Sequence, residues 1–207
     1  MIWLSFQPAA IFGESERQET PVVGMRINDE KGRFSFLIPE NGYLLKNWPM
    51  EDGGTEIRLK PNNELAGLMY GDYFIRVFSG IEAPLLNLDL NEIVDSILDT
   101  ISTTYGLEIR VLQKESQKFQ EHDAMHVEWL ALGKYQQMAD NIYEARQSYQ
   151  YVAEFFYHKT DFYMIGRSNP LPVLNDPANP KTKTPQGIDD RTRRDLKRFL
   201  NEFSFDR

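Results

Sequence analysis

The sequence contains no cysteine among its 207 residues. This absence excludes disulfide bridges, thiolate metal sites, iron–sulfur clusters and cysteine nucleophiles. It does not indicate a compartment, because a chain without thiols is equally safe in oxidising and reducing surroundings. Stability must therefore come from a buried hydrophobic core, and the length is sufficient for one domain with such a core.

Positive charge is also scarce, with 23 Lys and Arg against 31 Asp and Glu and a net charge of −8. Non-specific nucleic-acid binding draws most of its free energy from Lys and Arg on phosphates. We therefore predict no nucleic-acid partner.

The chain has no apolar run near the roughly 20 residues that a membrane-spanning helix needs. The opening segment 1–13 is apolar, but Pro8 interrupts it and the first basic residue is Arg17, so the charged start of an export signal is missing. Two interpretations stay open. Segment 1–13 is a terminal strand or docking segment, or it begins a mature chain whose export signal was removed upstream.

Familiar catalytic motifs are absent as well. The sequence has no G-x-S-x-G, no phosphate-binding glycine loop and no dinucleotide fingerprint. Carboxylates are numerous, but nothing in their spacing selects one pair as acid and base. We predict that the protein is not an enzyme.

Period-two alternation of apolar residues predicts strands at 33–39, 55–60, 73–78, 107–112, 125–131, 149–157 and 162–166. The last two form an aromatic-rich hairpin. Residues 134–148 fit a helix or a long loop about equally well. The proline-rich stretch 168–187 predicts an irregular loop.

Helical spacing appears twice. From Asp89 to Tyr105 the apolar residues recur at three and four, with Asp89 as N-cap and Gly106 as the stop. A closing helix follows Asp189, a plausible cap, with Leu196 and Phe199 on its apolar face. Strands, helix, strands and helix in this order predict an α+β fold, a central antiparallel sheet flanked by helices. The domain would span 24–205, preceded by an N-terminal extension at 1–23.

Several local signatures in this order resemble the PsbP-like family over residues 32–205. They are Gly32–Tyr43, the helix at 89–105, His122–Trp129, the aromatic hairpin at 149–166 and Phe199–Phe205. Tyr43 stands where the family usually has Trp, and 1–31, 61–71 and 168–187 have no clear counterpart.

The resemblance implies a non-enzymatic accessory protein or lipoprotein outside the cytoplasm, in the periplasm or cell envelope. Its partner would be another protein or a membrane-associated complex, and the role binding or assembly. We then expect the encoded precursor to extend upstream of Met1. A cytoplasmic location is the alternative, in which case the resemblance describes shape and not role.

One cluster, Glu121, His122, Asp123 and His126, suggests a metal site. On a helix, two histidines four apart would meet at one ion, whereas on a strand they lie about 13 Å apart. Alternation of Met125, Val127 and Trp129 predicts a strand, which favours two solvent-facing histidines and no cofactor. The alternative is a metal-binding protein or metal-dependent enzyme that uses His122, Asp123 and His126. We interpret His158, at the hairpin tip, as part of a wet turn.

Arg191, Arg194 and Arg198 recur at spacing 0, 3, 7 on one face of the closing helix. This row is a candidate surface for an anionic protein partner or lipid headgroup. Interleaved acids such as Asp190 and Asp195 allow the plainer interpretation of a solvated charged face. The loop 168–187 with the outer aromatics of the hairpin is a second candidate interface.

Overall fold

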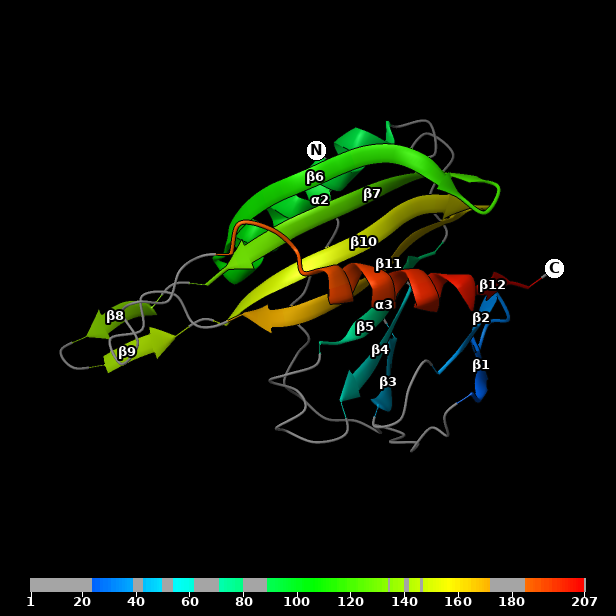
Figure 1. The fold of residues 1–207 in the computed structure, drawn as a ribbon, viewed down its shortest axis with the longest axis horizontal. Helices are drawn as coiled ribbons and strands as arrows, with labels where there is room; N and C mark the ends of the chain where they lie inside the picture. The colour runs from blue at the N-terminus through cyan, green and yellow to red at the C-terminus, as the bar shows by residue number, and fades with distance from the viewer. Residues whose placement is uncertain are drawn as a thin grey trace.

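A computed structural model describes residues 24–38, 43–49, 54–61, 71–79, 89–133, 135–139, 142–145, 147–171 and 185–206. Its centre is a seven-stranded sheet in the order β3-β4-β5-β11-β10-β7-β6 (Figure 1). The strands are β3 (Tyr43–Pro49), β4 (Thr55–Pro61), β5 (Tyr73–Phe78), β6 (Glu108–Phe119), β7 (His122–Leu132), β10 (Ser148–His158) and β11 (Asp161–Leu171). Every neighbouring pair is antiparallel, which confirms the predicted α+β class.

Two helices cover opposite faces of this sheet, α2 (Leu90–Tyr105) and α3 (Asp190–Asn201) (Figure 1). Successive residues of a strand point to opposite faces. Val94 and Ile97 of α2 pack against the strand residues that point to one face of the sheet, among them Trp129 and Phe155. Phe199 of α3 packs against the strand residues that point to the opposite face. The two apolar layers leave the outer side of each helix exposed.

The predicted ends of the helices are confirmed by their capping contacts. The Asp89 side chain accepts from the N–H of Asn91, and Gly106 ends α2 in the left-handed conformation (φ 59°) that glycine adopts readily. The Asp189 side chain likewise accepts from the N–H of Thr192 at the start of α3.

A small second sheet joins the two ends of the described chain. Its order is β1-β2-β12, with β1 (Arg26–Asn28), β2 (Phe34–Leu37) and β12 (Ser204–Phe205). It packs on the α3 side, where Phe34 and Phe203 stack with ring centroids 5.2 Å apart. Sequence periodicity did not predict β1 or β12, because strands this short show no alternation.

Residues 134–148 were expected to form a helix or a loop, and that expectation is wrong. The structure has a two-stranded hairpin there, β8 (Tyr135–Ala139) and β9 (Ile142–Ala145), separate from the main sheet (Figure 1). The sequence offers a reason, because two short runs containing Tyr and Ile flank Asp140 and Asn141, which favour turns.

The predicted aromatic hairpin is confirmed and is longer than expected, since β11 continues through the first residues of the presumed loop. Pro170 is paired with Tyr149 of β10. Pairing of β11 with β5 ends at Arg167, so Pro170 lies where one side of β11 is an edge, which tolerates proline. Residues 172–184 of the loop and the extension 1–23 lie outside the described residues.

Candidate functional site

Helix α3 starts in a network of polar side chains on the sheet. Gln150 of β10 accepts a hydrogen bond from the backbone N–H of Asp189 (3.2 Å) and donates another to its carboxylate. Thr192 donates to the same carboxylate through its N–H and its hydroxyl, both at 2.8 Å. Burial alone would raise the pKa of Asp189, but these bonds outweigh it and lower the pKa. The first turn is thus fixed to β10.

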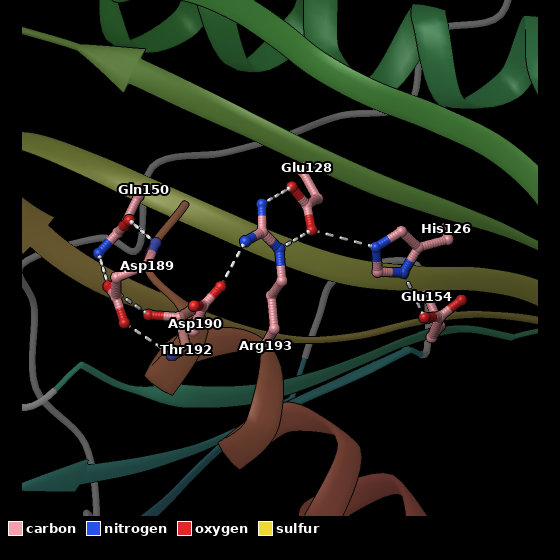
Figure 2. Close-up of polar contacts among 8 residues, drawn as sticks. All are labelled: His126, Glu128, Gln150, Glu154, Asp189, Asp190, Thr192 and Arg193. Carbon is pink, nitrogen blue, oxygen red and sulfur yellow. Dashed lines mark hydrogen bonds and ion pairs between the residues drawn. The ribbon is translucent and has the colours of Figure 1, made fainter. Parts of the chain in front are cut away.

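One turn further along, Arg193 joins α3 to β7. Its Nε and Nη2 donate to the two carboxylate oxygens of Glu128 at 2.5 and 2.7 Å (Figure 2). The hydrogen bonds from Arg193 are the main reason that the pKa of Glu128 is lowered. Reciprocally, the carboxylate raises the pKa of Arg193. This two-point contact is the geometry in which Arg binds carboxylates most strongly.

The polar contacts continue along β7 to His126, and we call the residues from Asp189 through Arg193 and Glu128 to His126 and Glu154 the polar row (Figure 2). Its Nδ1–H donates to Glu154 of β10 at 2.6 Å, and its Nε2 lies 3.5 Å from Glu128. Gln117 of β6 donates to the other oxygen of Glu154 at 2.6 Å. Burial would lower the pKa of His126, but the two carboxylates outweigh burial and raise it. The two carboxylates thus favour the protonated imidazole, the form that would compensate their buried charge.

A second ion pair lies under the helix. Arg167 of β11 places Nη2 3.3 Å from Asp195 of α3, and both side chains are almost completely buried. The Arg167 guanidinium also lies over the ring of Tyr73, 4.4 Å from its centroid. A buried pair of this kind is weak evidence for stability, because desolvation offsets much of the attraction between the charges. The pair joins the underside of α3 to β11.

The outer side of α3 carries the predicted arginine row. Arg191, Arg194 and Arg198 are exposed, as is Lys197 between them. Arg191 lies 3.6 Å from the buried carboxylate of Asp195. Arg194, Lys197 and Arg198 form no ion pair with any other residue that the structure describes. The row therefore presents positive charges to solvent, on a helix whose other side is joined to the sheet by ion pairs.

The three candidate metal ligands are not brought together. His122 and His126 lie on β7 as predicted, four residues apart, and Asp123 is 89% exposed beside Lys118 at 2.7 Å. His122 instead faces His158, with Nε2 and Nδ1 of the two rings 3.1 Å apart. Within the described ranges, no three His, Asp or Glu side chains are grouped to hold a metal ion.

Two histidines differ from their expected surroundings. His158 was interpreted as a wet turn residue, but it is only half-exposed and its ring stacks on Phe205 at 4.0 Å between centroids. His126 was interpreted as facing solvent, but its side chain is only 17% exposed. The sequence analysis also missed Glu128 and Glu154. Glu154 had a signal, because it lies between Val152 and Phe156 on one face of its strand, where a buried carboxylate requires a partner. Glu128 had none, since it lies on the face opposite Met125, Val127 and Trp129.

Comparison with known proteins gives structural likeness alone. No family model matches the sequence, and no curated protein matches it. The structure is similar to that of cyanobacterial PsbP (CyanoP) from Synechocystis, with 12% identity, a TM-score of 0.58, and coverage of 93% of this chain and 98% of that chain. It is also similar to the Ran-binding protein Mog1p from Saccharomyces cerevisiae, with 10% identity, a TM-score of 0.55, and coverage of 92% and 96%.

Identities this low are informative about the fold alone. In the structure, no helix within the described residues is long and apolar enough to cross a membrane. The order of strands, the two helices on opposite faces and both structural likenesses agree with the resemblance found in the sequence. The chain has the PsbP-like fold.

Proposed function

We propose that this protein is a non-enzymatic binding module, and that the outer face of α3 docks against an acidic protein surface. The observation that carries the proposal is the exposed row of Arg194, Lys197 and Arg198, which have no ion pair with another described residue. The chain as a whole has a net charge of −8, so this row is a positively charged patch on a negatively charged protein. Complementary charge gives specificity and fast association at interfaces.

The rigidity of α3 supports the same function. Arg193 on Glu128, Arg167 on Asp195 and the capped N-terminus fix the helix before any partner arrives. A partner then orders only the exposed side chains and not the helix, which lowers the entropic cost of binding. The polar row beneath α3 is, in this proposal, a support for the binding face and not a catalytic centre.

A protein partner is favoured over a small molecule by the kind of surface. The row lies on the convex outer side of a helix, whereas small-molecule sites are concave and mostly apolar. Mog1p, which shares the fold, is a Ran-binding protein. The family resemblance further supports a place in the periplasm or cell envelope, which protease treatment of intact and opened native cells would test.

Binding is tested with a fluorescent glutamate-rich peptide as the acidic probe, by anisotropy at low salt. Reversing two cations with R194E/R198E should weaken peptide binding about tenfold, because exposed ion pairs contribute roughly 0.2–1 kcal/mol each. The control K118E/K159E makes the same change in net charge on exposed lysines elsewhere. Equal weakening by both variants, or no binding by the natural chain, would contradict the proposal.

Vesicles separate the two sources of negative charge. Phosphatidylserine vesicles should bind the natural chain no better than they bind R194E/R198E. A vesicle affinity that R194E/R198E abolishes, without matching peptide affinity, would replace the protein partner with a lipid surface.

Metal binding through His122, Asp123 and His126 is the competing proposal and has a direct test. A ligand that binds only the folded state raises its melting temperature. We expect added Zn²⁺ to leave the melting temperature unchanged. An increase that is lost in H122A/H126A would favour the metal-dependent alternative.

A further inference from the structure

The outer face of α2 carries a row of acids that the proposed function does not use. Glu92, Asp95 and Asp99 are all exposed, on the side of the helix away from the buried Val94 and Ile97. The row has a fixed support, because α2 is capped at both ends and packed on the sheet. The Asp95 carboxylate forms an ion pair with Lys114 of β6 at 2.6 Å. Its negative charge is therefore partly compensated, and Glu92 and Asp99 carry most of the negative charge of the row.

This acidic row matches the basic row of α3 in spacing. Glu92, Asp95 and Asp99 recur at 0, 3, 7, and so do Arg191, Arg194 and Arg198. At about 1.5 Å of rise per residue, both rows are about 10 Å long and each follows one side of a helix. Opposite signs at the same spacing allow three side-chain contacts at once between two helices.

We infer that the acidic surface recognised by α3 is α2 of a second copy of this chain. The inference rests on the proposed function and names its partner. It draws on charge complementarity, because the two helices carry the matched rows described above. Within one copy the rows cannot meet, since α2 and α3 lie on opposite faces of the same sheet (Figure 1).

The same placement determines the type of assembly. A copy cannot present α2 and α3 to the same neighbour, because the sheet separates them. The contact is therefore head-to-tail, and it builds an open chain or a closed ring of copies instead of a twofold dimer.

The contact must be weak and sensitive to salt. Exposed ion pairs contribute little each, Asp190 adds one negative charge near the basic row, and the net charge of −8 opposes association. At about 10 mM salt the screening length is about 30 Å, and at about 1 M it is about 3 Å. Association is expected in the first condition and not in the second.

Sedimentation velocity of the full chain over a range of concentrations tests this. We compare the natural chain with R194E/R198E, with E92K/D99K and with an equal mixture of the two. Each variant alone loses the opposite charges at two of the three matched positions and should stay monomeric at low salt. The mixture should associate again, because the reversed positions of α3 now meet the reversed positions of α2, and the natural α2 of one variant meets the natural α3 of the other.

Net charge does not explain such rescue. Each reversal of two residues changes the net charge by four units, from −8 to −12 in R194E/R198E and to −4 in E92K/D99K. The two variants therefore still repel each other on average. K118E/K159E, also at −12, should associate with E92K/D99K no more than the natural chain does, and its mixture is the control.

The outcomes separate this inference from the proposed function. A natural chain that stays monomeric at low salt, while still binding the glutamate-rich peptide through α3, overturns self-association and leaves the proposed function standing. Loss of both overturns both. Association that survives in either variant alone also overturns the inference, because it must use another surface.

Discussion

His126 and His158 lie on the same face of the sheet, yet their surroundings move their pKa values in opposite directions. Burial would lower the pKa of His126, but Glu154 and Glu128 outweigh it and the pKa is raised. Burial lowers the pKa of His158, and the neighbouring His122 and Lys159 lower it further, with Asp161 opposing. Residue type alone therefore does not give the response of a histidine to pH.

Stability should depend on pH with opposite sign at these two residues. The raised pKa of His126 means that its stabilising contribution is complete below about pH 6.5 and lost as pH rises through the folded-state value. The contribution of His158, whose pKa is lowered, is present above about pH 6.5 and lost as pH falls. Denaturant unfolding measures this. The free energy of unfolding of H126Q should fall less than that of the natural chain as pH rises, and that of H158Q should fall less as pH decreases. Unchanged profiles would contradict the assignment.

Gly71 is required because β11 approaches it too closely for a side chain. A Cβ at this position would lie 1.3 Å from the backbone oxygen of Ser168. Gly71→Ala should therefore lower the free energy of unfolding by about 3 kcal/mol, because the backbone of β11 must move. Gly187→Ala is the matched control, since nothing lies within 4 Å of its Cβ position. Similar melting temperatures for the two variants would show that the strand yields easily.

At the scale of the element, adjacent arginines of α3 have different roles. Arg193→Ala leaves the buried carboxylate of Glu128 without its main partner and should cost about 1–2 kcal/mol of stability. Arg194→Ala removes an exposed side chain and should change stability by less than about 0.5 kcal/mol. Chemical denaturation measures both. Hydrogen exchange in α3 should increase in Arg193→Ala alone, and equal effects would exclude the anchoring role.

Elements with a long amphipathic pattern could be predicted from the sequence, and contacts between them could not. The stripe of α2, the cap at Asp189 and the alternation around Trp129 are local and were confirmed. The pairing of His126 with Glu154 depends on the register of β7 against β10, which places them directly opposite. Local periodicity gives the faces of each strand but not its register.

At the scale of the whole molecule, β12 connects the end of the described chain to several distant elements. Phe205 contacts the rings of His158 and Phe156, and Ser204 bonds to Ser35 at 3.0 Å. Phe205→Ala should lower the free energy of unfolding by about 2 kcal/mol, less than for a fully buried Phe. Met25→Ala, at a 46% exposed position, should have little effect in the same thermal unfolding experiment. Comparable losses would indicate that β12 is peripheral.

The pairing of β12 with β2 also sets a time order during synthesis. Ser35 and Ser204 are 169 positions apart, so β2 has no second neighbouring strand until the segment between them has been synthesised. Until then Phe34 lacks the ring of Phe203, and that part of the apolar layer stays open on the nascent chain. This part of the apolar layer therefore cannot close on the ribosome before residues 203–205 have left the exit tunnel.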